Sequence, residues 1–176
     1  TGKPKGVMIE HASVSNYMSW LHGYLNLDDQ SASDCSSNIA FDFTLSVSVA
    51  SLIKGHKVCL CSDDRKKDLS QYVQHIIDNN INYAKLTPGY LSVLLEHIKS
   101  AGIKLPLRKI ILGGEALKII DVRDWLEINP DCKFYNEYGP TEATVGVSQH
   151  TYTIDNCMES VAGTLIGNPG FNIRYY

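Results

Sequence analysis

The chain has 176 residues, which is long enough for one substantial domain with its own hydrophobic core. Charged residues make up 20% of it and the net charge is -3, so no basic field supports binding to nucleic acid. No apolar run is long enough to span a bilayer, and the five irregularly spaced cysteines argue against a disulfide framework and favour a reducing cytoplasm.

The first third of the chain alternates short apolar runs with amphipathic segments. Residues 6–9 predict a short strand, and residues 12–25 predict a helix because apolar side chains recur there at helical spacing. Residues 35–41 are expected to form the end of a strand. Residues 43–55 predict a helix closed by a glycine, and residues 57–61 predict a further strand.

The same alternation continues, with helices predicted over 68–80, 89–102 and 119–128 and strands over 82–86, 108–114 and 133–139. Strands that alternate with helices of this length predict an α/β fold of three layers, in which helices cover both faces of a mostly parallel sheet. In such sheets, ligands bind beyond the carboxyl ends of the strands.

Polar residues end or follow four of the predicted strands. They are FDFT at 41–44, Lys85, GGEA at 113–116 and NEYGPTE at 136–142. Because the carboxyl ends of parallel strands share one edge of a sheet, we expect these segments to converge on one site.

The segment at 136–142 carries the most chemistry. Tyr138 offers a flat ring, Thr141 a hydroxyl that can bind a phosphate oxygen, and Glu142 a carboxylate suited to Mg²⁺. Together these groups could hold a nucleotide triphosphate and its metal. On spacing alone, an elaborate surface turn explains the segment equally well.

The other motifs are weaker when each is taken alone. TGKPKG at 1–6 suits a phosphate, but it is not a Walker A loop, and a lysine-rich turn is the simpler reading. Asp42 could pair with a ligand ammonium or simply cap a helix. The glycines of 113–116 could admit a flat ring against the backbone or merely turn the chain into a helix.

In their order along the chain, these motifs resemble those of the adenylation domains of nonribosomal peptide synthetases, which share a superfamily with acyl-CoA ligases and luciferases. TGKPKGVMIEH resembles the end of that family's phosphate loop, and FDFT, GGEAL and NEYGPTEATVG resemble later core motifs. GVMIEHASVSN and YGPTEAT favour the peptide-synthetase branch. The resemblance implies a flavodoxin-like subdomain over 1–150 and the first strands of a β-barrel subdomain over 151–176.

The resemblance also implies ATP and Mg²⁺ as cofactors and gives the motif residues their roles. The backbone of 113–116 and Tyr138 would enclose adenine, and Asn136 would bond its amino group. Thr141 would contact the α-phosphate and Glu142 would hold Mg²⁺. The candidate catalytic residues are Lys5, Thr141 and Glu142. The remaining nucleotide-binding candidates are Thr1, Gly2, Lys3, Gly6, Gly114, Glu115, Ala116 and Gly139.

The implied reaction joins an amino acid to ATP, giving aminoacyl-AMP and pyrophosphate, and then passes the aminoacyl group to a phosphopantetheine thiol. The implied partners are peptidyl carrier and condensation domains of a parent synthetase and an MbtH-like protein. The serine/threonine-rich start of the phosphate loop, the ribose-binding aspartate, the hinge and the lid with its lysine have no counterpart in the sequence. We therefore expect a fragment that does not catalyse by itself.

Matching motifs place the amino-acid pocket at Asp42, Phe43, Ser46, Lys85, Ile111, Gly113, Glu137, Val145 and Gly146. Asp42 would take the substrate ammonium. A side-chain carboxamide would suit both Lys85, as donor, and Glu137, as acceptor, and the pattern resembles the family's asparagine-type pockets. L-Asparagine is therefore the expected substrate, followed by aspartate and then glutamine.

Two other functions remain open. An acyl-CoA or aryl-acid ligase would share the nucleotide site, although Asp42 would repel an acid that lacks an amine. A non-catalytic α/β binding domain is the other alternative. The presence of Lys5, Thr141 and Glu142 argues against it.

Overall fold

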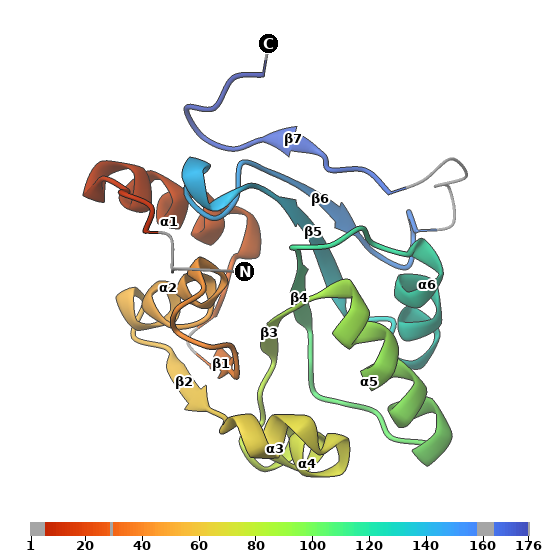
Figure 1. Ribbon diagram of the computed structural model, residues 1–176. Coiled ribbons are helices and arrows are strands. Elements are labelled where there is room, and N and C mark those ends of the chain that lie inside the picture. The colour runs from red at the N-terminus through yellow and green to blue at the C-terminus, as the bar shows by residue number, and fades with distance from the viewer. Residues whose placement is uncertain (1–5, 29, 158–163, 176) are drawn as a thin grey trace.

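A mostly parallel β-sheet runs through the centre of the molecule (Figure 1). The computed structural model describes residues 6–28, 30–157 and 164–175. Within these residues the sheet has seven strands in the order β2-β1-β3-β4-β5-β6-β7. The strands are β1 (Ala32–Cys35), β2 (Lys57–Leu60), β3 (Tyr83–Leu86), β4 (Lys109–Leu112), β5 (Lys133–Tyr138), β6 (Ser148–Tyr152) and β7 (Asn168–Pro169).

Neighbouring strands from β2 to β5 pair in parallel, whereas β6 and β7 are antiparallel additions beyond β5. The order of the parallel part is the flavodoxin-like order 2-1-3-4-5, in which the chain switches sides next to β1 and β3. A crevice forms at the carboxyl ends of the strands at such a switch point, and ligands bind there.

Helices cover both faces of the sheet, which confirms the predicted fold class (Figure 1). The helices are α1 (His11–Leu25), α2 (Val49–Ile53), α3 (Asp63–Lys67), α4 (Leu69–Asp78), α5 (Pro88–Ala101) and α6 (Ile119–Ile128), with 3₁₀ turns η1 (Asp42–Ser46) and η2 (Thr141–Ala143). Apolar stripes of α4, α5 and α6 pack on one face, with Trp125 and Phe134 in edge-to-face contact. Residues of α1 and α2 pack on the other face, over Tyr83, Ile111 and Tyr135.

The alternation of side chains along β3 decides what lies in each layer. Ala84 and Leu86 face the α4–α5–α6 core. Tyr83 and Lys85 point to the opposite face, where Tyr83 packs with the α1 core and Lys85 contacts Ser46. The period of two therefore places one lysine in an otherwise apolar strand on the face covered by α1.

Local sequence signals define both ends of α5, which follows β3 directly. Thr87 caps the helix by accepting from the backbone N–H of Tyr90, and Pro88 occupies the first helical position. Gly102 ends the helix in the left-handed conformation, with φ of 64°. The turn between β3 and α5 is thus short and fixed, and it brings Thr87 to the carboxyl edge of the sheet.

Several sequence-based boundaries are wrong. Residues 6–10 form no strand, and the strand expected to end within 35–41 lies at 32–35 instead. The helix predicted over 43–55 is divided into η1 and α2, and Ser48 at the break bonds the carbonyl oxygen of Thr44 through its hydroxyl.

The sheet continues through the predicted subdomain boundary at residue 150. β6 begins at Ser148 and pairs with β5 up to Tyr152, whose partner is Phe134. Residues 158–163 lie outside the described part of the chain. The division at 150/151 stays a prediction.

Candidate active site

A cavity of about 650 Å³ opens at the carboxyl ends of β1, β3, β4 and β5. Segments that follow all four strands contribute to its wall, as expected for a doubly wound sheet. Its lining residues are Ser36, Ser37, Asn38, Phe41, Asp42, Phe43, Asp63, Lys66, Lys85, Leu86, Thr87, Tyr90, Gly113, Gly114, Glu137, Gly139, Pro140, Thr141 and Val145. The structure thus brings together parts of every motif that the sequence placed at this edge.

Asp42 lies on the cavity wall with its side chain available to a ligand. It is the first residue of η1, whose N-cap is Phe41, and no side-chain hydrogen bond caps that turn. The alternative role as a helix cap is therefore not what the structure shows. A half-exposed carboxylate that shares a cavity with Gly113 is suited to bind an ammonium group.

Lys85 and Glu137 form a buried ion pair at the inner end of the cavity. Lys85 Nζ lies 2.5 Å from Glu137 Oε1, and both side chains are 2% exposed. Lys85 also donates to Ser46 Oγ at 3.0 Å and lies 4.6 Å from the centroid of the Phe43 ring. Buried charges need partners of this kind. The sequence predicted that both residues face the pocket, but not that they bond each other.

Two tyrosines of α1 contact Glu137 from the other side. The Tyr24 hydroxyl donates to Oε2 at 2.7 Å, and the Tyr17 hydroxyl donates to Oε2 at 3.1 Å. Burial raises the pKa of each tyrosine well above its ordinary value, and the charge of Glu137 raises it further. Both hydroxyls are therefore neutral donors at any physiological pH.

Glycines allow the backbone and the charged pair to approach closely. A β-carbon on Gly113 would lie 3.1 Å from the carbonyl oxygen of Glu137 and 3.9 Å from the Phe43 ring. At Gly146 it would lie 2.6 Å from Cδ of Glu137. Gly113 thus leaves room within the cavity, whereas Gly146 leaves room for the Glu137 carboxyl group behind it.

Three pocket candidates remain, and two of them lie beneath the cavity surface. Ser46 and Ile111 are fully buried, Ser46 as a bonding partner of Lys85 and Ile111 as part of the α1 core. Val145 lines the cavity directly. The structure therefore divides the predicted pocket residues into a lining set and a supporting set.

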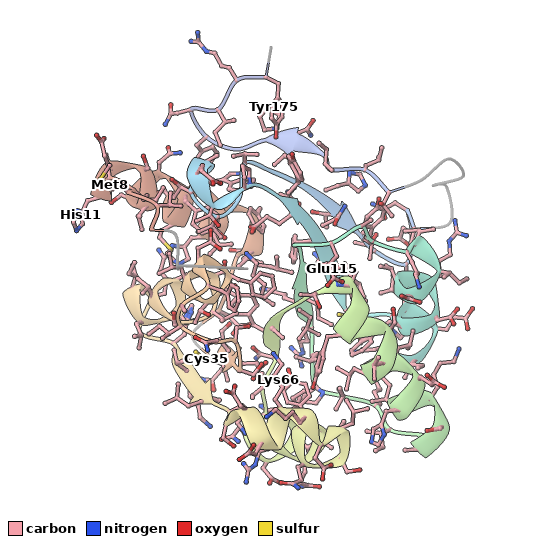
Figure 2. All side chains as sticks on the ribbon, viewed as in Figure 1. Met8, His11, Cys35, Lys66, Glu115 and Tyr175 are labelled. Carbon is pink, nitrogen blue, oxygen red and sulfur yellow. The ribbon has the colours of Figure 1, made fainter. Side chains whose placement is uncertain are left out.

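The predicted adenine contacts lie at the ends of β4 and β5. Tyr138 is 52% exposed, so its side chain is accessible to a ligand. The Asn136 side-chain nitrogen donates to the carbonyl oxygen of Leu165 at 2.8 Å, which leaves its amide oxygen to accept from an amino group. Residues 114–116 are exposed, and the Glu115 carboxylate accepts from Gly89 N–H at the start of α5, where Figure 2 shows it. Of the predicted adenine contacts, Gly113 and Gly114 line the cavity, whereas Asn136 and Tyr138 are not among its lining residues, so the adenine role stays a prediction.

Thr141 and Glu142 lie in η2, just beyond Tyr138, and both are exposed. No group of three or more His, Cys, Asp or Glu side chains suited to a metal occurs among the described residues. Mg²⁺ is commonly held by one or two carboxylates together with substrate phosphates, so a single carboxylate is chemically sufficient. Thr141 lines the cavity described above, whereas Glu142 lines a second cavity beside α1, and its metal role stays a prediction. Thr1, Gly2, Lys3 and Lys5 lie outside the described residues, and Gly6 is exposed at the edge of them.

The sequence did not single out several lining residues. Ser36, Ser37 and Asn38 follow β1, and Tyr90 lies in the first turn of α5. Lys66 of α3, labelled in Figure 2, donates to the carbonyl oxygen of Ser36 at 3.2 Å. The position of residues directly after strands could have identified some of them, but the predicted position of β1 was wrong.

Comparison with known proteins identifies the family of the chain. The model of the family described as AMP-binding enzyme matches residues 1–176. The chain belongs to this AMP-binding family. Bacitracin synthase 3 of Bacillus licheniformis is 31% identical over 184 residues, and tyrocidine synthase 3 of Brevibacillus parabrevis is 33% identical over 179 residues. Both alignments cover 100% of the chain but only 3% of each synthase.

Solved structures of nonribosomal peptide synthetases share the fold. The nonribosomal peptide synthetase FmoA3 has a TM-score of 0.87 at 20% identity, over 100% of this chain and 19% of that one. The four-domain synthetase AB3403, in a structure with AMP and glycine, has a TM-score of 0.80 at 27% identity, over 97% of this chain and 12% of that one. The predicted resemblance to adenylation domains of peptide synthetases is confirmed.

The helices of the described residues are too short or too polar for a membrane span. None of them combines the length and apolar character that crossing a bilayer requires.

Proposed function

We propose that this AMP-binding chain is the ATP- and amino-acid-binding part of an adenylation domain that activates L-asparagine as asparaginyl-AMP. The observation that carries the proposal is the cavity that Asp42, Lys85 and Glu137 line together with Gly113 and Gly114. Asp42 supplies charge for an α-ammonium group, and the inner pair supplies a donor and an acceptor for a neutral polar side chain.

In the proposed reaction the substrate carboxylate attacks the α-phosphorus of ATP, and the bond to pyrophosphate breaks. Asp42 would hold the ammonium group at one end of the amino acid. Thr141 would donate to the α-phosphate, and Tyr138 and Asn136 would fix the adenine. Bound at Glu142, Mg²⁺ would neutralise phosphate charge. The protein would then act chiefly by positioning and by charge stabilisation.

The charge of the inner pocket supports selection of asparagine. Because Lys85 and Glu137 neutralise each other, neither an anionic nor a cationic side chain finds an unpaired partner there. Lys85 uses two of its three N–H groups on Glu137 and Ser46, which leaves one for a carboxamide oxygen. A mismatched hydrogen bond in a closed pocket costs about 1–3 kcal/mol, so aspartate should be disfavoured by about ten- to a hundredfold.

The wider setting is part of the same proposal. The aminoacyl group would pass to a phosphopantetheine thiol of a peptidyl carrier domain, beside a condensation domain of the parent synthetase in the cytoplasm. An MbtH-like protein is a further proposed partner. We also propose that these 176 residues alone form no aminoacyl-AMP, since they hold no counterpart of the family's ribose-binding aspartate or lid lysine.

ATP–pyrophosphate exchange by the parent synthetase, with all twenty amino acids and a set of aryl acids, tests the proposal. Asparagine should give the highest rate, and Glu137→His should narrow or reverse the preference over aspartate. A clear preference for an apolar or aromatic amino acid would overturn the pocket assignment alone. Activity on aryl acids only, or no exchange at all, would overturn the proposed reaction.

A further inference from the structure

Lys85, Ser46, Tyr17 and Glu137 form a closed ring of hydrogen bonds beneath the cavity. Tyr17 bonds Ser46 Oγ at 2.6 Å, Lys85 donates to the same Oγ at 3.0 Å, and the Lys85–Glu137 pair leads back to Tyr17 at 3.1 Å. Tyr17 has one proton, which it donates to Glu137. The Ser46 hydroxyl must therefore donate to the oxygen of Tyr17, which assigns every hydroxyl proton of the ring.

Tyr24 adds a third donor to Glu137 from outside the ring. Tyr17 and Tyr24 are seven residues apart on α1, so both face the sheet from one side of the helix. The aromatic side chain of Tyr24 packs between Trp20, at a centroid distance of 5.0 Å, and Tyr135, at 5.3 Å. These aromatic contacts fix the position of its hydroxyl.

The donors around Glu137 determine what a ligand can still bind. A carboxylate has about four lone-pair sites, and Lys85, Tyr17 and Tyr24 occupy three of them. One acceptor site therefore remains on Glu137, next to the one remaining N–H of Lys85. A carboxamide presents the complementary donor and acceptor side by side, whereas a carboxylate presents two acceptors.

We propose that Tyr17 and Tyr24 of α1 are positioning residues for substrate specificity. By donating to Glu137, they fix the orientation of its carboxylate and leave a single acceptor beside a single donor. This inference rests on the proposed amino-acid activation. It assigns selectivity to two side chains that lie behind the pocket wall, on a helix that contributes nothing to the cavity lining.

The test compares Tyr24→Phe and Tyr17→Phe in the parent synthetase, with Tyr135→Phe as the matched control. Each variant loses one hydroxyl and keeps its ring, and Tyr135 belongs to the same aromatic cluster but makes no hydrogen bond to Glu137. The measurement is kcat/KM in pyrophosphate exchange for asparagine and for aspartate. Thermal unfolding identifies any variant that fails to fold, in which case the other tyrosine variant carries the test.

We expect the asparagine-to-aspartate ratio of kcat/KM to fall about tenfold in each Tyr17 or Tyr24 variant, which is about 1.4 kcal/mol. The control should keep the wild-type ratio. A purely structural role would lower kcat/KM for both amino acids equally, so an unchanged ratio in both tyrosine variants overturns the inference. A wild-type enzyme that prefers another amino acid contradicts the proposed substrate separately, before any variant is measured.

Discussion

Replacing Gly146 by alanine should destabilise the domain through one identified contact. The new β-carbon would lie 2.6 Å from Cδ, 2.8 Å from Cγ and 2.9 Å from Oε1 of Glu137. Side-chain β-carbons essentially never approach other atoms closer than 3.0 Å. The Glu137 side chain would have to withdraw, yet its carboxylate is bonded to Lys85 and Tyr24.

The size of the effect follows from these contacts. Overpacking a well-filled interior typically costs about 1–3 kcal/mol. The displaced group is one half of a buried ion pair, and misaligning such a pair leaves both charges poorly compensated. We therefore expect the free energy of unfolding to fall by about 3 kcal/mol, at the upper end of that range. The proposed activation of asparagine should fall with it.

Urea unfolding of the parent adenylation domain measures this loss, and a double-mutant cycle with Glu137→Ala identifies its cause. Removal of the Glu137 side chain removes the clash, so Gly146→Ala should cost much less in that background. Equal costs in the two backgrounds would show that the contact with Glu137 is not responsible, and the close packing of Gly146 against the charged pair would be refuted.

Three further predictions concern other parts of the chain. Glu142→Gln should reduce pyrophosphate exchange at limiting Mg²⁺, and unchanged exchange would refute the metal role. Because Glu142 is exposed, the same substitution should change the free energy of unfolding by less than about 1 kcal/mol. Gly23→Ala within α1 should stabilise the domain by about 0.5–1 kcal/mol in urea unfolding, because alanine favours a helix more than glycine does. The new β-carbon would lie 3.5 Å from the Phe171 ring, which is an ordinary van der Waals contact, and a loss of stability would contradict this prediction. Burial raises the pKa of Asp34 above its ordinary value despite hydrogen bonds from Ser36 and Tyr72. The stability that the protonated Asp34 side chain contributes is therefore present in acid and is lost as pH rises through the raised pKa. Asp34→Asn should therefore improve stability more at about pH 7.5 than at about pH 4, and an equal effect at both would refute the argument.

Periodic patterns in the sequence predicted the fold well. Helices α1, α4, α5 and α6 and strands β2 to β5 lie close to the expected ranges, because each has an apolar stripe or run of the right period. β1 was misplaced because it carries Ser33 and Asp34, polar residues that are buried only because distant groups bond them. Ser33 donates to the carbonyl oxygen of Val47, and Asp34 accepts from Tyr72. A local pattern contains no trace of such partners.

The same limit applies to the site. The motifs placed Asp42, Gly113 and Tyr138 at one edge of the sheet, because the rule for carboxyl ends of strands needs only the strand positions. The sequence places Tyr17 and Tyr24 only within the helix predicted over 12–25. The Tyr17 hydroxyl bonds Glu137, 120 positions away in the sequence, and the Tyr24 hydroxyl bonds it across 113 positions. Only the packing of α1 against β5 brings these groups together.

The segment between β5 and β6 shows how the tertiary structure overrides local preference at the pocket. Thr144 and Val145 both have left-handed backbone conformations, with φ of 67° and 65°, although neither is the glycine or asparagine that favours them. Such residues cost about 1–3 kcal/mol each and persist only where the surroundings enforce them. In this segment the bond from Val147 N–H to the Tyr138 carbonyl oxygen closes the loop, and the pairing of β5 with β6 continues from it.

The strained turn positions residues toward both the cavity and Glu137. It directs the buried Val145 side chain into the cavity lining and sets Gly146 against the Glu137 carboxyl group. Glu137 is in turn held by Lys85 from β3 and by Tyr24 from α1. Three separate parts of the fold thus converge on one carboxylate. The wall that would discriminate between side chains is therefore held by the turn, β3 and α1 together, and a change in any of the three parts should alter substrate preference without touching the adenine-binding candidates.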